Sequence, residues 1–208
     1  MIKEKSKTWA QISRNLGALF SYFPLTPDCY TWLTIPFALL GLLFIIFNYI
    51  WFGIIFYLIA GVLDLVDGAL ARHLNLATSR GAFLDGSLDR FIDFIVIFSY
   101  FWLPITTPWL PLGQWLCMAI FFAIMPSFEV AYANHRRAVD DPEEKIIWRI
   151  LNRGEMYFLM LLIPILSIYS SIWSGYFLII LVALSLITTL QTLWTTLYLA
   201  GKSEKSAD

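Results

Sequence analysis

Long apolar stretches alternate with charged segments along most of the sequence. Three stretches contain no Asp, Glu, Lys or Arg, and they cover residues 29–63, 94–128 and 156–201. A helix needs about 20 apolar residues to cross a bilayer, so each stretch has room for two crossings joined by a short turn. The pattern therefore predicts six membrane-spanning helices, over residues 30–48, 52–73, 84–104, 112–134, 147–168 and 175–199.

Residues 8–23 precede the first predicted span and have an amphipathic pattern instead. Their large apolar residues fall on one helical face and are Trp9, Ile12, Leu16, Leu19, Phe20 and Phe23. A helix of this kind lies in the membrane interface, although an ordinary packed helix explains the same pattern. No continuous apolar core with a cleavage site follows, so we expect no signal peptide. We expect one all-α integral membrane domain over residues 1–208, with a six-helix bundle over 30–199.

Composition and the placement of charge agree with a membrane protein. The chain is 59% hydrophobic and 14% charged, with a mean hydropathy of +0.71, whereas about a quarter of the residues of a soluble domain are charged. All 14 Lys and Arg residues lie in the N-terminal segment, around the loops after the second and fourth spans, or in the C-terminal tail. Positive charge marks the cytoplasmic side. We therefore expect both termini and both loops on the cytoplasmic side of the cell membrane.

Aspartates are concentrated around the loop between the second and third predicted spans. They are Asp64, Asp67, Asp85, Asp89 and Asp93. Within each span they are three or four residues apart and share a helix face, and the short loop makes the two helices antiparallel neighbours. Ionisable groups in a span are costly and mark function. Closely packed carboxylates favour hard cations such as Mg²⁺ or Mn²⁺, and four of them suffice for a two-metal site.

Small residues accompany these aspartates on both helices. Gly68 and Ala71 follow Asp67, and Gly81 lies one turn before Asp85. Small side chains let a ligand approach the backbone, although close helix packing uses the same residues. Arg72 adds a fixed positive charge that suits a phosphate. We therefore expect a ligand cleft beside the aspartates.

The whole segment resembles the signature of the CDP-alcohol phosphotransferase (CDP-alcohol phosphatidyltransferase) family. The resemblance rests on Asp64-Leu-Val-Asp67-Gly68-Ala-Leu-Ala71-Arg72, an eight-residue spacer and Gly81-Ala-Phe-Leu-Asp85-Gly-Ser-Leu-Asp89. Leu25-Thr26-Pro27-Asp28, followed by Thr31, is similar to the family's entry to the first span, where Asn is commoner than Asp28. The expected six spans and N-terminal surface helix are also similar to the architecture of this family.

This resemblance implies a reaction and a set of roles. The hydroxyl of one alcohol attacks a CDP-linked alcohol, such as CDP-diacylglycerol, and CMP is released. The implied metal ligands are Asp64, Asp67, Asp85 and Asp89, and Asp89 is also the implied catalytic base. The implied CDP/CMP site consists of Asp64, Asp67, Gly68, Ala71, Arg72 and Gly81. A homodimer is implied as well, whereas spacing alone does not choose the base.

The acceptor alcohol is less closely defined. The segment 81–90 resembles the branch that uses inositol phosphate, as do Ala131-Tyr132-Ala133-Asn134-His135-Arg136 and Arg153-Gly154-Glu155. That branch commonly has Ser, Lys and Arg at the positions of Ala131, Asn134 and Met156. Inositol phosphate is the expected acceptor, with glycerol 3-phosphate or another polar alcohol as the alternative. The candidate acceptor-binding residues are Arg136, Arg137 and Arg153, although such charges also follow from membrane topology alone.

Two residues have alternative roles, and two other classes of protein share some of these sequence features. Asp93 either holds a ligand or Arg90 in place or forms a buried ion pair, and Glu129 either lines the acceptor side or makes a structural hydrogen bond. Cation or proton transporters also carry intramembrane aspartates, but usually near mid-bilayer and in repeated halves. Di-iron carboxylate proteins use Glu-x-x-His pairs, and the sequence has none. The expected partners are a CDP-linked lipid, a polar alcohol or its phosphate, and the bilayer, with no nucleic acid.

Overall fold

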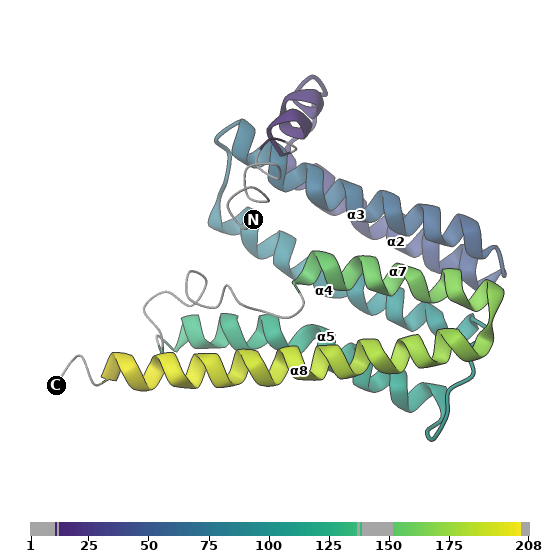
Figure 1. Ribbon diagram of the computed structural model, residues 1–208. Coiled ribbons are helices and arrows are strands. Elements are labelled where there is room, and N and C mark those ends of the chain that lie inside the picture. Colours follow the sequence, from purple (N-terminus) through teal and green to yellow (C-terminus); the bar gives the residue numbers. More distant parts are fainter. Residues whose placement is uncertain (1–10, 12, 137, 139–151, 205–208) are drawn as a thin grey trace. The chain divides into compact units, whose positions relative to one another are not determined.

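The computed structural model describes residues 11, 13–136, 138 and 152–204. These residues form helices and connecting loops and contain no strand, which confirms the predicted all-α class. The chain divides into two compact units, an N-terminal unit Met1–Trp102 and a C-terminal unit Leu103–Asp208 (Figure 1). The expectation of a single domain stays a prediction.

The N-terminal unit is built on α2 (Pro27–Ile46), α3 (Ile50–His73) and α4 (Ser79–Ser99), followed by the short 3-10 helix η1 (Tyr100–Trp102). Helix α2 packs against both α3 and α4, while the backbones of α3 and α4 make little direct contact. The expected neighbours α3 and α4 therefore meet through their side chains and not through close backbone packing. Helix α2 is in contact with both of them, and side chains meet where α3 ends and α4 begins.

Both turns that follow α2 and α3 are closed by an asparagine in the left-handed region. Asn48 has φ 64° and Asn75 has φ 56°. In each turn the next residue donates its backbone N–H to a carbonyl in the last turn of the helix, from Tyr49 to Phe44 at 2.8 Å and from Leu76 to Ala71 at 2.9 Å. Asparagine tolerates this conformation better than most residues and terminates helices in this way. The predicted C-terminal ends of the first two spans are therefore correct to within two residues.

The described part of the N-terminal segment is helical over residues 13–20 and rests against α3. Gly17 is buried, and a Cβ added to it would lie 2.7 Å from the Ala69 carbonyl oxygen. Phe20 packs edge-on against Tyr30 of α2, whereas Leu19 and Phe23 are more than half exposed. The predicted apolar face is therefore partly packed against the protein and partly exposed. Residues 8–10 and 12 lie outside the described part of the chain.

The C-terminal unit contains α5 (Leu112–His135), α7 (Arg153–Tyr169) and α8 (Ser171–Glu204), and α8 packs against the other two. A loop over residues 103–111 precedes α5 and is tied to α8, because Thr106 donates its backbone N–H to the Ser171 carbonyl at 2.9 Å. Helix α8 begins four residues before the predicted start at residue 175, since a single residue, Ser170, suffices for the turn. The predicted start of the fifth span at residue 147 lies outside the described residues.

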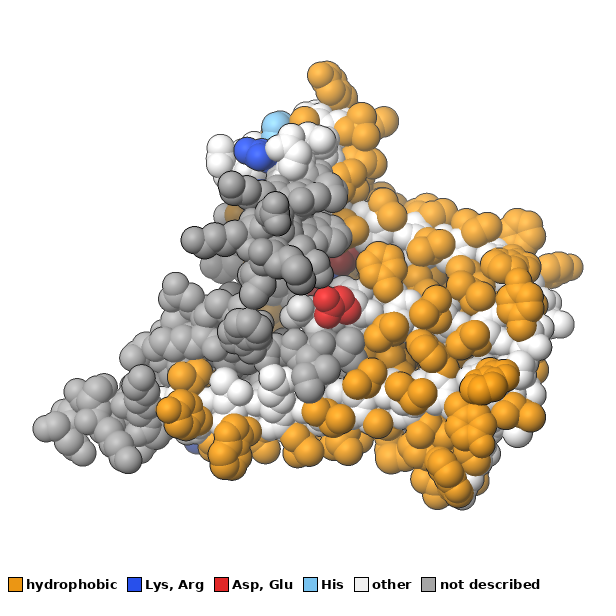
Figure 2. Space-filling view, viewed as in Figure 1, with side chains coloured by type: hydrophobic (Ala, Val, Ile, Leu, Met, Phe, Trp, Pro, Cys, Tyr) orange, Lys and Arg blue, Asp and Glu red, His pale blue; other side chains and the backbone are white. Residues whose placement is uncertain are grey.

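Four described helices are long and apolar enough to cross a membrane, namely α2, α3, α5 and the segment Ser171–Ala200 of α8. Helix α4 carries too many charged residues to be counted with them, and α7 has 17 described residues. In Figure 2, apolar side chains cover most of the coloured surface, as expected for a protein surrounded by lipid. The structure therefore supports a membrane protein, whereas the count of six spans stays a prediction.

Candidate active site

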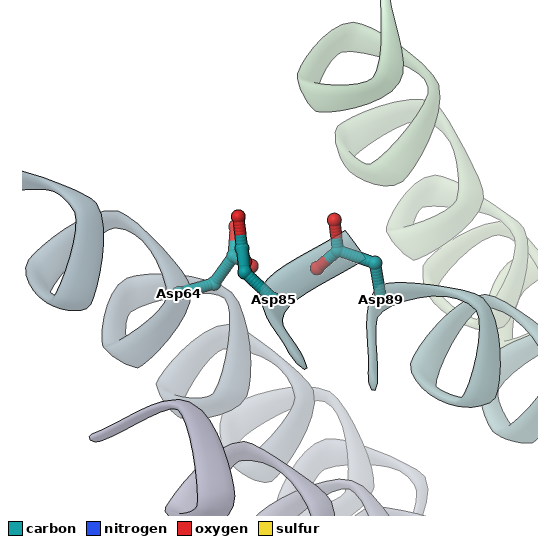
Figure 3. Close-up of side chains that lie close together, drawn as sticks. All are labelled: Asp64, Asp85 and Asp89. Atoms are coloured by element: carbon teal, nitrogen blue, oxygen red, sulfur yellow. The ribbon is translucent and has the colours of Figure 1, made fainter. Parts of the chain in front are cut away.

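Three aspartate carboxylates from two helices converge in the N-terminal unit. Asp64 is on α3, whereas Asp85 and Asp89 lie one turn apart on α4. One carboxylate oxygen from each residue lies within 4.8 Å of the other two. Figure 3 shows Asp64 extending from its helix to the Asp85 carboxylate, with Asp89 beside them. Three of the four metal ligands expected from the sequence therefore come together.

Carboxylates at this spacing repel one another strongly. At an effective dielectric of about 20, two unit charges 4.8 Å apart repel by roughly 3–4 kcal/mol. Asp64 and Asp85 are half-buried and Asp89 is buried, so water screens their charges incompletely. Positive charge placed among the three oxygens would remove this repulsion.

Arg90 supplies one positive charge at the edge of the cluster. Its guanidinium lies 3.7 Å from the Asp89 carboxylate and 3.6 Å from that of Asp93, which is one turn further along α4. Asp93 is buried, with 3% of its surface exposed. The contact with Arg90 is compatible with both roles considered for Asp93, namely a buried ion pair and a residue that holds Arg90 in place. Through Arg90, this pair also neighbours Asp89.

The donor atoms fit a hard divalent cation. Carboxylate oxygens are the ligands that Mg²⁺ and Mn²⁺ prefer. Oxygens bound to one Mg²⁺ at 2.0–2.1 Å lie up to about 4.2 Å apart, and the three aspartate oxygens already lie within 4.8 Å. The upper limit on the spacing of the three oxygens therefore exceeds that ligand separation by only about 0.6 Å.

A cavity of about 180 Å³ opens next to the cluster, where the start of α2, the end of α3 and the start of α4 meet. A water molecule occupies about 30 Å³ in the liquid, so a group the size of a phosphate or a nucleobase fits inside. Five residues expected to bind CMP line this cavity, namely Asp67, Gly68, Ala71, Arg72 and Gly81. Asp85 joins the cavity to the aspartate cluster, since it belongs to both. Asp64, the sixth expected CMP-site residue, is in the cluster only.

Asp67 faces the cavity and is not one of the three converging carboxylates. It is 4% exposed, and its Oδ2 has no hydrogen-bond partner among the described residues. A buried polar atom without a partner costs about 1–3 kcal/mol. A ligand or cation in the cavity would recover that energy by contacting Oδ2. Asp67 is therefore suited to bind something that the chain itself does not supply.

Two glycines shape the wall of the cavity. A Cβ added to Gly68 would lie 3.3 Å from Nη1 of Arg72, so the absence of a side chain leaves room for the guanidinium. A Cβ added to Gly81 would lie 3.2 Å from the Thr78 hydroxyl oxygen, which accepts the Gly81 backbone N–H at 3.0 Å and caps α4. The small residues of the signature therefore serve contacts with Arg72 and with the helix cap.

Sequence reasoning missed part of this site. Thr78 lines the cavity and caps α4, which consequently begins at Ser79 instead of residue 84. The signal was present as Thr-Ser-Arg-Gly, but the span was predicted from apolarity, and the first turn of α4 is polar. Asp28 and Thr31 of α2 also line the cavity, and the sequence had indicated only that they begin the first span.

The expected acceptor-binding arginines belong to the C-terminal unit. Arg136 follows α5, and its guanidinium carbon lies 5.7 Å from the centre of the Tyr132 ring. Arg153 is the first residue of α7, which is held by a capping box that the sequence analysis missed. There the Asn152 backbone N–H donates to the Glu155 carboxylate at 3.2 Å. Arg137 lies outside the described residues.

Comparison with known families identifies the chain. The profile of the family described as CDP-alcohol phosphatidyltransferase matches residues 24–198. The chain belongs to this family. The matched residues include the whole cavity and the three converging aspartates, and the site contains the residues by which the CDP-alcohol phosphatidyltransferase family was expected from the sequence.

The curated relatives share less than a third of their residues with this chain over the matched segments. A protein named bifunctional IPC transferase and DIPP synthase, from Archaeoglobus fulgidus, is 29% identical over 147 residues, which cover 68% of this chain and 28% of that protein. A phosphatidylinositol phosphate synthase from Cutibacterium acnes is 31% identical over 94 residues, or 45% of each chain. Across the curated relatives, the match spans at most 63% of the relative's length.

Among solved structures, the phosphatidylinositol phosphate synthase of Mycobacterium tuberculosis has the same fold. Its crystal structure with CDP-DAG bound has a TM-score of 0.65 and 22% identity, and the match covers 89% of this chain and 94% of that one. A second crystal structure of that protein contains manganese and citrate, with a TM-score of 0.64, 21% identity and 88% coverage of both chains.

Proposed function

We propose that this member of the CDP-alcohol phosphatidyltransferase family transfers a phosphatidyl group from a CDP-linked lipid to a hydroxyl acceptor and releases CMP. One observation carries the proposal, namely a cavity that shares Asp85 with a cluster of three aspartates. A nucleotide site beside a cation site is what transfer from a nucleoside diphosphate requires. Family membership supports the same reaction.

The CMP half of the donor occupies the cavity. Gly68, Ala71 and Gly81 leave its walls open, and Arg72 offers a planar guanidinium to the diphosphate. The CDP-DAG bound to the mycobacterial protein of the same fold supports a lipid-linked donor. The lipid tails then extend into the bilayer, away from the charged cluster.

The reaction forms one bond and breaks one. The acceptor hydroxyl oxygen bonds to the phosphorus that carries the lipid, and that phosphorus loses the oxygen that bridges it to the CMP phosphate. CMP leaves with the bridging oxygen, and the hydroxyl proton passes to a base. We assign the base to Asp89, which is the buried member of the cluster and can lie within hydrogen-bond reach of the incoming hydroxyl.

A divalent cation, Mg²⁺ or Mn²⁺, completes the proposed site. Asp64, Asp85 and Asp89 would hold it, and the buried Oδ2 of Asp67 is the fourth candidate ligand. When bound, it would offset the charge on the donor phosphates and on the leaving CMP. The manganese in the mycobacterial protein supports this assignment.

Inositol phosphate is the acceptor that we propose. The relatives from Cutibacterium acnes and Mycobacterium tuberculosis are both named phosphatidylinositol phosphate synthases, which supports this choice over glycerol 3-phosphate. Arg136, Arg137 and Arg153 are the residues assigned to the acceptor phosphate. Guanidinium groups bind phosphates through paired hydrogen bonds.

The membrane arrangement completes the proposal. Six helices cross the bilayer, the N-terminal amphipathic helix lies at its surface, and both termini and the active site are cytoplasmic. The placement of all 14 basic residues supports this orientation. We also propose a homodimer, which is testable by cross-linking in membranes.

The experiment that tests the function is CMP release by the purified protein. Wild type is incubated with CDP-diacylglycerol and either Mg²⁺ or Mn²⁺, together with inositol phosphate, glycerol 3-phosphate or free inositol in parallel. CMP formation that requires both the donor and the metal supports the transferase, and the fastest acceptor defines its specificity. No CMP from any acceptor, together with cation flux into vesicles, would instead indicate a transporter.

A further inference from the structure

The N-terminal helical segment, residues 13–20, touches the proposed donor site through one side chain. Nη2 of Arg72 donates a hydrogen bond to the Ser13 hydroxyl oxygen at 3.0 Å, across 59 positions of sequence. Arg72 lines the cavity, and Nη1 of the same guanidinium lies over Gly68. The guanidinium is therefore held between a glycine on one side and a hydroxyl on the other.

Packing on either side of Ser13 fixes its position. Ser13, Gly17 and Phe20 recur at helical spacing and so lie along one face of the segment. Gly17 is buried against α3, where a Cβ would lie 2.7 Å from both the Ala69 carbonyl oxygen and Cβ of His73. Phe20 packs edge-on against Tyr30 with ring centres 5.7 Å apart. A residue with a side chain could not come as close to α3 as Gly17 does, and this close packing brings Ser13 next to Arg72.

The hydrogen bond matters because Arg72 is otherwise exposed to solvent. An arginine side chain has many rotamers, and ordering it for a ligand costs conformational entropy. A guanidinium that is already held at the cavity wall avoids much of that cost when a phosphate binds, since a preorganised site loses less freedom.

We propose that Ser13 is a positioning residue for the CDP-linked donor, which makes the N-terminal segment part of the donor site. This inference rests on the proposed function, because it takes the cavity as the place where the CDP group binds. Ser13 acts through Arg72 and does not itself contact the donor.

The test is Ser13→Ala in the full-length protein, assayed by CMP release against CDP-diacylglycerol concentration. Losing this solvent-exposed hydrogen bond is expected to raise KM for CDP-diacylglycerol by about three- to tenfold, the range of an ordinary hydrogen bond. The kcat stays near wild type, because Arg72 contacts the diphosphate before and during the reaction alike. KM for the acceptor also stays unchanged.

Three variants separate positioning from a general loss of structure. Ser13→Thr keeps the hydroxyl and is expected to restore the wild-type donor KM. Ser21→Ala, the matched control, removes a hydroxyl eight residues further along the chain that donates to the Ala18 carbonyl at 2.7 Å, and should leave the donor KM unchanged. In an Arg72→Ala background, Ser13→Ala should have no further effect, since the two changes remove one interaction.

The outcomes distinguish this inference from the proposed function. A wild-type donor KM in Ser13→Ala, or additive effects in the double variant, would overturn the role of Ser13 and leave the transferase intact. If wild type releases no CMP, the proposed function fails. Direct binding of radiolabelled CDP-diacylglycerol then decides whether Ser13 positions the donor site. Weaker binding by Ser13→Ala than by wild type supports the inference, whereas equal binding or no binding by either overturns it.

Discussion

The Asp64 carboxylate of α3 lies within 4.8 Å of the Asp85 carboxylate of α4, although the two helix backbones make little direct contact. Helix α2 packs against both and so sets their separation. The gap is therefore spanned by acidic side chains, and the cavity opens beside them. An arrangement that places like charges together across a space is suited to a cation and to a phosphorylated ligand.

Replacing Asp64 by Asn tests the cation site. The change removes one charged ligand from α3 and leaves Asp85 and Asp89 in place, so divalent cations should bind more weakly. We expect the Mn²⁺ or Mg²⁺ concentration for half-maximal CMP release to rise at least tenfold, with partial activity recovered at high metal concentration. A metal titration of the purified variant measures this directly.

The matched control for Asp64→Asn is Ser87→Ala on α4. Ser87 lies between Asp85 and Asp89 in sequence, and its hydroxyl donates to the Phe83 carbonyl at 2.7 Å. Its removal should leave the metal requirement unchanged. An Asp64→Asn protein with the wild-type metal requirement would exclude Asp64 as a ligand.

Asp89→Asn tests the proposed base. The amide keeps the shape of the side chain but cannot take up the proton of the incoming hydroxyl as a carboxylate does. We expect kcat to fall by a factor of about 100 or more, while donor binding, measured with radiolabelled CDP-diacylglycerol, changes much less. Wild-type turnover by a correctly folded Asp89→Asn protein would remove Asp89 from the chemistry.

Asp93→Asn is expected to weaken the fold without removing a residue of the proposed cation site. Asp93 is buried and lies 3.6 Å from Arg90, so the change leaves that guanidinium with less negative charge around it. The loss should be about 1–3 kcal/mol, seen as a lower midpoint of thermal unfolding in detergent. An unchanged midpoint would mean that this ion pair contributes little to stability.

Much of the N-terminal unit could be predicted from the sequence. The first two spans were placed correctly because each contains an apolar run long enough to cross a bilayer. The left-handed asparagines that close the following turns, Asn48 and Asn75, were not used in that prediction. The pairing of Asp85 with Asp89 was also predictable, since a spacing of four puts side chains on one helix face, whereas Asp67, three residues after Asp64, is not part of the cluster. These features depend on local sequence and need no knowledge of tertiary packing.

What escaped prediction depends on contacts between distant segments. The sequence did not reveal that α2 packs against both α3 and α4, because ridge-and-groove packing depends on all three surfaces together. Nor did it reveal that Gly17 would dock on α3 and bring Ser13 to Arg72. Gly17 had no assigned role, since a single glycine in an amphipathic pattern has no distinctive signal.

Thr78 connects the stability of α4 to the shape of the cavity and provides a last prediction. Its hydroxyl accepts the Gly81 backbone N–H at 3.0 Å, and both residues line the cavity. Thr78→Ala should destabilise the protein by about 1 kcal/mol, the usual cost of losing such a cap, and should raise the donor KM because the first turn of α4 carries Gly81. Thr78→Ser keeps the cap and should behave as wild type in both measurements. Equal unfolding midpoints and donor KM values for Thr78→Ala and Thr78→Ser would contradict a role for the cap.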